Sequence, residues 1–291
     1  MLTPELLHSL RNLPLAARRA AEGMLAGAHA SRRHGAGMEF SQYRPYQPGD
    51  DLRRLDWRLA ARSDKYFLRE SEVDTSLTVS LVLDASASLN HRDDNKLSKL
   101  DYARLLLAAL AYLAQQQGDA VGLTLLLPGG LRQLPPRADT RQLPRLYHAL
   151  ETLEATGTFP DAATLAPLTA RRQRGLTVCV SDLYEENGEI TQLLGRLRAT
   201  SGDVLLLHLM ASNELNFSYQ GSVTFRDLET GRTVQLDASQ QRPAYQRQLQ
   251  AWLRDTARAA RQQGLDYHLL DTSQPLDGAL REFLKRRQAM S

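Results

Sequence analysis

The sequence predicts an α/β fold with a doubly wound, mostly parallel β-sheet, and three observations support this fold class. Short apolar, partly β-branched runs alternate with longer segments of helical periodicity, as in sheets that carry helices on both faces. The chain has 291 residues, 42% of them hydrophobic, which is enough to bury a large core. Two of the apolar runs end in the acidic residues Asp84 and Asp182.

Residues 1–72 are expected to form an N-terminal extension. Leucines and alanines between positions 2 and 30 recur at steps of three and four, which predicts two short helices that meet at Pro14. A basic, glycine-containing stretch follows at 31–37. Residues 66–70 are expected to form a strand that leads into the main domain.

The main domain is expected to span residues 73–291 and to begin with a buried strand at 77–83. The other expected strands are 121–127, 131–134, 175–181, 204–210 and 265–270, and the expected helices are 96–117, 139–153, 162–172, 188–200, 240–263 and 276–287. The strand at 131–134 follows Pro128-Gly129-Gly130 and is expected to be an antiparallel edge strand. A small β-hairpin insertion is expected within 211–239, with its turn at 229–232.

Oxygen-bearing side chains follow the first strand at alternate positions, as Asp84, Ser86 and Ser88. Alternate residues of an extended or turning backbone point to the same side, so one carboxylate and two hydroxyls can meet at one point. Ligands of α/β sheets bind beyond the carboxyl ends of the strands, and a set of oxygens suits Mg²⁺ or Mn²⁺. Asp and Ser are also favoured helix N-caps, and the spacing alone favours neither interpretation.

The Asp-x-Ser-x-Ser pattern resembles the metal-ion-dependent adhesion site (MIDAS) of von Willebrand factor A domains. The resemblance implies that a threonine from a second loop and an aspartate from a third loop complete the site. Asp182 matches the aspartate, and Thr158, which follows Gly157, matches the threonine, with Thr156 as a close competitor. The implied ligands of Mg²⁺ or Mn²⁺ are Asp84, Ser86, Ser88, Thr158 and Asp182.

A segment before the first strand of the main domain is rich in aromatic, proline and charged residues. This signature segment contains Tyr43-Arg44-Pro45-Tyr46, Pro48-Gly49-Asp50-Asp51, Arg53, Asp56-Trp57-Arg58 and Ala61-Arg62. It resembles the signature of the bacterial domain-of-unknown-function 58 family, and the resemblance covers nearly the whole chain. The resemblance implies a von Willebrand A-like fold, a MoxR-type AAA+ ATPase as partner and no established enzyme activity.

Two interpretations of the signature segment stay open. It is either a packed polar scaffold, with Trp57 buried and Asp56 paired with an arginine, or a surface that binds a partner. The residues concerned are Tyr43, Arg44, Tyr46, Asp50, Asp56, Trp57 and Arg58.

Composition argues against several classes of protein. The net charge of +3 is spread over 36 basic and 33 acidic residues, whereas nucleic-acid binders usually carry a clustered basic stripe.

Cys179 is the only cysteine, which fits a reducing compartment. Charged residues interrupt the N-terminal leucines, so no signal peptide is expected. The longest apolar helical run, 105–114, is too short to span a bilayer, and a cytoplasmic protein without a transmembrane segment is expected.

Two function classes remain. The favoured one is a non-enzymatic, divalent-metal-dependent protein-interaction module, an adaptor for a MoxR-type AAA+ ATPase. The alternative is a Mg²⁺-dependent phosphatase or hydrolase of the doubly wound class. Phosphoaspartyl chemistry needs a second carboxylate two residues after the first, and position 86 is a serine. The sequence also lacks the glycines of a nucleophile elbow, a phosphate-binding loop and a His-Glu-x-x-His pattern.

Overall fold

The computed structural model describes residues 3, 12–32, 43–45, 66–69, 76–93, 96–169, 173–184 and 188–290. The chain divides into two compact units, one formed by residues 1–25 with 76–291 and the other by residues 26–75. In the smaller unit, strands β1 (Tyr43–Pro45) and β2 (Phe67–Arg69) pair antiparallel. A strand therefore lies within the range expected at 66–70.

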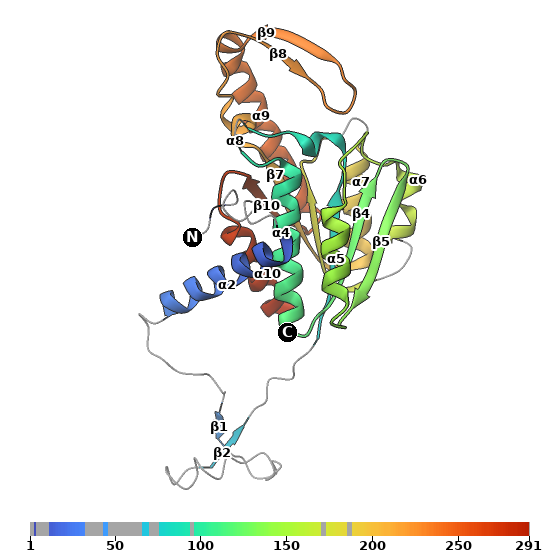
Figure 1. Cartoon of the computed structure of the whole chain (residues 1–291), viewed down its shortest axis with the longest axis vertical. Coiled ribbons are helices and arrows are strands. Elements are labelled where there is room, and N and C mark those ends of the chain that lie inside the picture. Colours follow the sequence, from blue (N-terminus) through green and yellow to red (C-terminus); the bar gives the residue numbers. More distant parts are fainter. Residues whose placement is uncertain are drawn as a thin grey trace. The chain divides into compact units, whose positions relative to one another are not determined.

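The larger unit is built on a six-stranded sheet with the strand order β10-β7-β6-β3-β4-β5 (Figure 1). Its strands are β3 (Thr78–Asp84), β4 (Ala120–Leu127), β5 (Gly130–Arg137), β6 (Gln173–Ser181), β7 (Ser201–Met210) and β10 (Asp266–Asp271). All neighbouring strands are parallel except β4 and β5. The prediction of a doubly wound, mostly parallel sheet with an antiparallel edge strand is confirmed.

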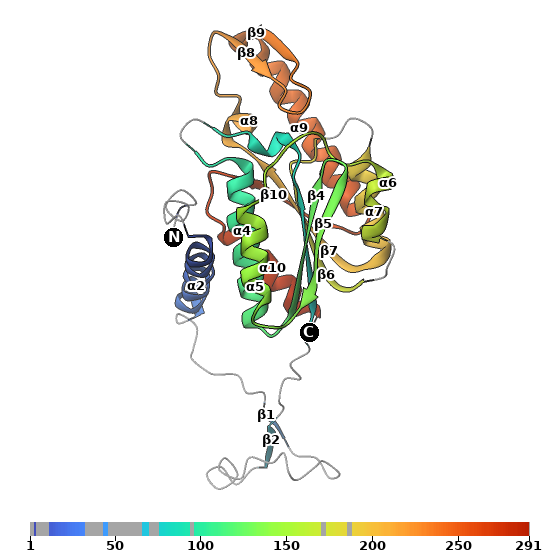
Figure 2. The same cartoon turned by 45° about the vertical axis from the view of Figure 1, so that its right-hand side comes forward.

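Helices cover both faces of this sheet. The described helices are α2 (Leu13–Arg32), α4 (Lys99–Gln116), α5 (Gln142–Glu151), α6 (Ala162–Leu165), α7 (Glu189–Thr200), α8 (Ser212–Asn216), α9 (Ala238–Gln262) and α10 (Asp277–Met290), with 3₁₀ turns η2 (Ala87–Asn90) and η3 (Ala166–Thr169). Figure 2 shows α4, α5 and α10 on one side of the sheet and α6, α7 and α9 on the other. The single helix expected at 162–172 is instead one α-helical turn followed by η3, because Pro167 cannot donate a backbone hydrogen bond.

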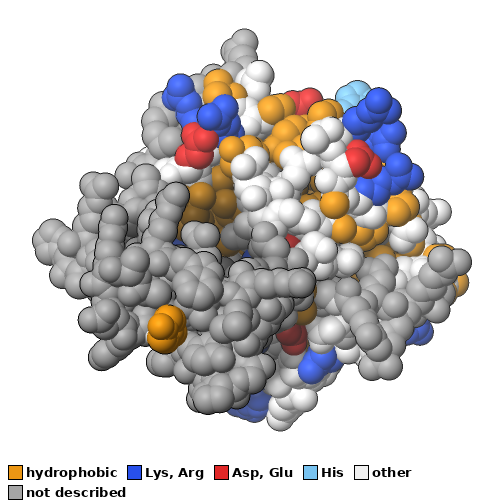
Figure 3. Space-filling view, turned by 90° about the horizontal axis from the view of Figure 1, so that it is seen from below, with side chains coloured by type: hydrophobic (Ala, Val, Ile, Leu, Met, Phe, Trp, Pro, Cys, Tyr) orange, Lys and Arg blue, Asp and Glu red, His pale blue; other side chains and the backbone are white. Residues whose placement is uncertain are grey.

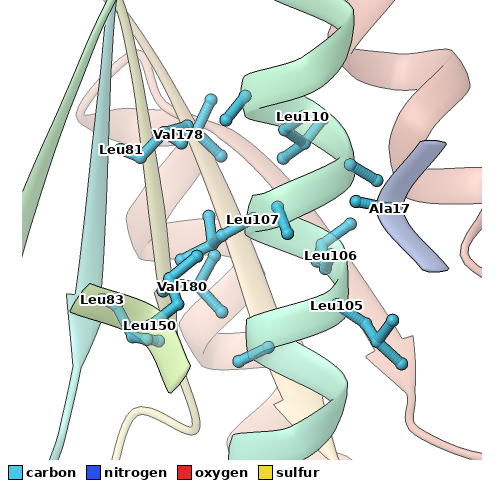
Figure 4. Close-up of a cluster of buried hydrophobic side chains, with 14 of the residues drawn as sticks. Ala17, Leu81, Leu83, Leu105, Leu106, Leu107, Leu110, Leu150, Val178 and Val180 are labelled. Carbon is cyan, nitrogen blue, oxygen red and sulfur yellow. The ribbon is translucent and has the colours of Figure 1, made fainter. Parts of the chain in front are cut away.

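The core follows the strand periodicity. Leu81 and Leu83 of β3 pack on the α4 side of the sheet, whereas Val82 packs on the α7 side. Figure 4 shows Leu107 of α4 pointing toward the neighbouring strands, with Ala17 of α2 on the opposite side of α4. Helix α4 is therefore enclosed by the sheet and other helices, which explains its nearly continuous apolar run at 105–114.

Helix α2 occupies the place of the second of the two N-terminal helices that were expected to meet at Pro14. The helix begins at Leu13, and Pro14 lies in its first turn, where the missing N–H has no intrahelical partner to lose. Four alanines and one methionine form its buried stripe, which packs in the same core cluster as α4: Ala16, Ala17, Ala20, Ala21 and Met24. The segment expected to form a helix before Pro14 lies largely outside the described residues.

The hairpin insertion is present as the antiparallel strands β8 (Ser222–Arg226) and β9 (Thr233–Asp237). It is fixed to the rest of the unit by aromatic contacts around Phe217, whose ring centroid lies 5.4 Å from Tyr219, 5.7 Å from Phe225 and 4.4 Å from Tyr245. Aromatic pairs at such distances contribute more than area burial alone. The hairpin is therefore attached to α8 and α9 through Phe225, which lies near its turn.

The described part of the chain contains no helix with the length and apolar character that a bilayer crossing requires. On the face shown in Figure 3, the described Lys and Arg side chains form separate small groups among acidic and uncharged side chains. Cys179 is buried within β6, and burial raises the pKa of its thiol to about 12. The thiol is therefore protonated and enclosed at neutral pH.

Candidate metal centre

The loop after β3 brings the Asp-x-Ser-x-Ser side chains together. Asp84 and Ser86 are each 1% exposed, and the backbone N–H of Ser86 donates to Asp84 Oδ1 at 2.9 Å. The hydroxyls of Ser86 and Ser88 share a hydrogen bond of 3.0 Å. The Ser86 side chain does not cap η2, although Ser86 stands at its N-cap position. The alternate spacing thus places these oxygens close together in one loop. The Ser86 side chain makes no capping hydrogen bond to η2, so the capping interpretation is not supported for Ser86.

The loop after β6 lies beside this group because β3 and β6 are adjacent parallel strands. Ser181 Oγ donates to Asp84 Oδ2 at 2.7 Å and accepts from the Leu183 backbone N–H at 2.9 Å. Leu183 has a positive φ of 57°, an uncommon conformation for a side-chain-bearing residue. Asp182 is completely buried between these two residues. We call Asp84, Ser86, Ser88 and Asp182 the strand-end cluster.

The strand-end cluster lies where the strand order changes direction. From β3 the chain continues to β4 on one side, and after β5 it returns to β6 on the other side. Such a switch point opens a crevice at the carboxyl ends of the two central strands. Asp84 and Asp182 follow those two strands, so the topology explains why acids 98 positions apart meet.

A third loop, residues 155–158, lies against the loop after β3. The backbone N–H of Thr156 donates to Ala85 O, and that of Ala87 donates to Gly157 O, each at 2.9 Å. Gly157 has a φ of 62°, and a Cβ there would lie 2.7 Å from the Pro128 ring. Glycine is therefore required at this close approach.

The two threonines of this loop occupy different places. Both threonines are exposed, but Thr158 lines a cavity of about 450 Å³ together with Ser88 and Lys99, whereas Thr156 does not line it. The structure therefore brings Thr158 to the edge of the strand-end cluster.

Lys99, at the start of α4, is the main feature that sequence reasoning missed. Its side chain is fully buried, and its Nζ donates to Asp182 Oδ2 at 2.7 Å and to Glu214 Oε1 at 2.9 Å. It also lies 4.9 Å from the centroid of the Tyr184 ring. A cation at a helix N-terminus opposes the helix dipole. The two carboxylates therefore supply the compensation that a buried ammonium requires.

The strand-end cluster carries more negative than positive charge. Lys99 is the positive partner shared by Asp182 and Glu214. Burial, followed by the charge of Asp182, raises the pKa of Asp84 to about 7. The second carboxylate oxygen of Asp182, Oδ1, is buried without a hydrogen-bond partner. An unsatisfied buried carboxylate oxygen is costly, so the cluster is suited to an additional cation.

The signature segment is mostly beyond what the structure describes. Tyr43 and Arg44 belong to β1, where they pair with Arg69 and Leu68 of β2. Tyr46, Asp50, Asp56, Trp57 and Arg58 lie outside the described residues. Among the described residues, no group of three or more His, Cys, Asp or Glu side chains is arranged to hold a metal. A site here therefore depends on the hydroxyl groups.

We predict that Lys99→Met destabilises the fold strongly, because it leaves Asp182 and Glu214 without their shared cation. Removing one partner of a buried ion pair lowers the free energy of unfolding by about 3–5 kcal/mol. Chemical denaturation measures this change. Lys285→Met, at a position whose side chain is 80% exposed, is the matched control and should have little effect, because exposed ion pairs contribute little to stability. Equal stability of the two variants would contradict this account of Lys99.

Comparison with solved structures returns similar α/β folds. BatB from Bacteroides thetaiotaomicron matches 74% of this chain and 100% of its own at 15% identity, with a TM-score of 0.48. An aerotolerance-related membrane protein from Bacteroides fragilis matches with a TM-score of 0.47 and 17% identity, covering 72% of this chain and all of its own. The SpRpn10 VWA domain has a TM-score of 0.35 and 14% identity, covering 46% of this chain and 76% of its own. The strand order of the central sheet establishes the α/β fold class by itself.

Sequence comparison identifies the family. "Uncharacterized protein Rv1480" of Mycobacterium tuberculosis and "Uncharacterized protein Mb1516" of Mycobacterium bovis are each 29% identical to this chain over 232 residues, which is 78% of this chain and 72% of theirs. The pattern of the family described as "Protein of unknown function DUF58" matches residues 42–253. Because this match covers most of the chain and agrees with the resemblance of the signature segment, the protein belongs to the DUF58 family.

Proposed function

We propose that this protein is a non-enzymatic protein-interaction module that binds its partner through a divalent cation, Mg²⁺ or Mn²⁺. The observation that carries the proposal is that one loop at the switch point of the sheet holds both the Asp84 carboxylate, which accepts from the Ser86 backbone N–H, and the hydrogen-bonded pair of Ser86 and Ser88 hydroxyls. These groups are hard oxygen ligands, which Mg²⁺ and Mn²⁺ prefer.

The side chains around the strand-end cluster fit such a cation. The residues that would hold it are Asp84, Ser86, Ser88, Asp182 and Thr158. The ammonium group of Lys99 binds one carboxylate oxygen of Asp182, and the other carboxylate oxygen is buried without a hydrogen-bond partner. Thr158 lines the same cavity as Ser88, which favours it over Thr156. A divalent cation would balance the excess negative charge and offer a coordination position to a carboxylate of the partner.

The geometry of Asp84 argues against the alternative of a Mg²⁺-dependent phosphatase or hydrolase. A nucleophilic carboxylate needs an oxygen that can reach the substrate. Asp84 is 1% exposed, and its two oxygens accept hydrogen bonds from the Ser86 N–H and the Ser181 hydroxyl. Asp84 is therefore better placed to orient the loop and balance charge than to attack a phosphoryl group.

The choice of partner rests on the family resemblance, which favours a MoxR-type AAA+ ATPase. The cavity beside Ser88 and Thr158 has a volume of about 450 Å³, which is enough for a side chain of a partner. We propose that a glutamate or aspartate of the ATPase enters it, and that this chain acts as an adaptor.

We predict that Mn²⁺ raises the melting temperature of the wild type but not that of Asp84→Ala. A ligand that binds only the folded state at a hundred times its Kd stabilises it by about 2.7 kcal/mol. Differential scanning fluorimetry with Mn²⁺ or chelator measures this shift.

Thr158→Ala and Thr156→Ala form a matched pair for the same measurement. The shift should shrink in Thr158→Ala and persist in Thr156→Ala. Ser88→Ala, at a half-buried position, serves as a second ligand variant if Asp84→Ala does not fold. A wild-type shift that all ligand variants retain would contradict the proposed site.

We predict that this protein binds the MoxR-type ATPase of its own organism only when the cation is present. Surface plasmon resonance should show binding in Mg²⁺ or Mn²⁺ and loss of binding in chelator, mainly through faster dissociation. Circular dichroism confirms that the protein stays folded in chelator. Undiminished binding in chelator would contradict the metal-bridged contact.

A further inference from the structure

The turn of the β8–β9 hairpin lies over the cavity beside the strand-end cluster. We call residues 227–232 the hairpin tip. Asp227, Leu228, Glu229 and Thr230 of the tip line this cavity together with Ser88. The hairpin, which was expected only as a small insertion, therefore forms one wall of the candidate site.

Asp227 fixes the conformation of the hairpin tip. Its Oδ1 accepts from the backbone N–H groups of Glu229 at 2.8 Å and Thr230 at 3.3 Å, and its Oδ2 accepts from Thr230 Oγ1 at 2.6 Å. Its backbone N–H donates to Arg232 O at 2.8 Å, and its carbonyl accepts from Gly231 N–H at 2.9 Å. Such side-chain-to-backbone bonds hold a turn in one shape, so the position of Glu229 is set in advance.

Glu229 presents its carboxylate to the strand-end cluster. Glu229 is half-buried and lines the same cavity as Ser88 and Thr158. Burial raises the pKa of its carboxyl group, and the charge of Asp182 raises it further, whereas the Ser88 and Ser86 hydroxyls lower it. Its Oε1 is buried without a hydrogen-bond partner. Asp182 and Glu229 thus each keep one buried carboxylate oxygen without a hydrogen-bond partner, and Glu229 shares its cavity with Ser88 of the strand-end cluster. A carboxylate in such a place is destabilising unless a cation accompanies it.

The hairpin is also linked to the residues that hold Lys99. Phe225 of β8 contacts Phe217 at the end of α8, and Tyr245 OH donates to the Glu214 carbonyl at 2.9 Å. Glu214, on α8, binds Lys99. The turn end of β8 and the charged cluster are thus both supported by α8, which favours a fixed approach of the tip.

We infer that Glu229 is a further ligand of the divalent cation, supplied by the chain itself from the hairpin tip. This inference rests on the proposed function, because it requires the cation. Glu229 then occupies the coordination position that a partner's carboxylate needs. A partner must therefore displace Glu229, so the hairpin tip limits access to the site.

Isothermal titration calorimetry with Mn²⁺ tests this inference on the full chain. Glu229→Gln should weaken Mn²⁺ binding on the order of tenfold or more, since the number of charged ligands sets cation affinity. Glu154→Gln removes one charge from an exposed residue near Thr158 that does not line the cavity, and it should leave the affinity unchanged. Asp227→Ala keeps Glu229 but frees the tip, and it should also weaken binding.

Hydrogen exchange at residues 222–237 provides a second measurement that does not depend on affinity. Mn²⁺ should slow exchange of the tip amides in the wild type but not in Glu229→Gln. If the wild type binds Mn²⁺ and Glu229→Gln binds it equally well with equal protection of the tip, the inference is wrong while the proposed function stands. If the wild type does not bind Mn²⁺, both are wrong.

Discussion

The ion pairs of Lys99 with Asp182 and Glu214 are the interaction on which the carboxyl edge of the sheet depends. They join the start of α4, the loop after β6 and the short helix α8 through side chains that are almost fully buried. Burying a charge is expensive unless it is paired with good geometry. The position of each of these three elements is therefore fixed by the same ammonium group.

Lys99 does not neutralise the whole edge. Asp84 and Asp182 follow adjacent strands, Glu214 approaches from α8, and Glu229 approaches from the hairpin tip. Two of these carboxyl groups keep a buried oxygen without a partner. The hydroxyls of Ser86 and Ser88 lie among them. This combination of excess negative charge and neutral oxygen donors is the physical basis for proposing a divalent cation.

The sequence predicted those parts of the structure that local patterns determine. Apolar strands at 77–83 and 175–181 placed Asp84 and Asp182 at strand ends, and the turn at 229–232 predicted the hairpin.

Lys99 lies on the same side of its helix as Ala103 and Leu107, so the helical pattern of the sequence carried a local indication that Lys99 is buried. Its partner Asp182 is 83 positions away, however, and only the strand order brings them together. Helix α8 is too short for a periodic pattern, so Glu214 had no local signal. The place of Glu229 depends on how the hairpin folds over the sheet edge, which no local rule specifies.

A crystal structure of the protein grown with Mn²⁺ would test the central claim, that the strand-end cluster holds a divalent cation beside Lys99. Anomalous scattering at a wavelength that excites manganese locates the ion without prior assumptions. The account predicts one strong peak within coordination distance, about 2–2.3 Å, of the Ser86 and Ser88 hydroxyls, with Lys99 still bound to Asp182. If the crystals bind Mn²⁺ at other positions but show no anomalous peak at the carboxyl ends of β3 and β6, the claim of a cation in the strand-end cluster is contradicted.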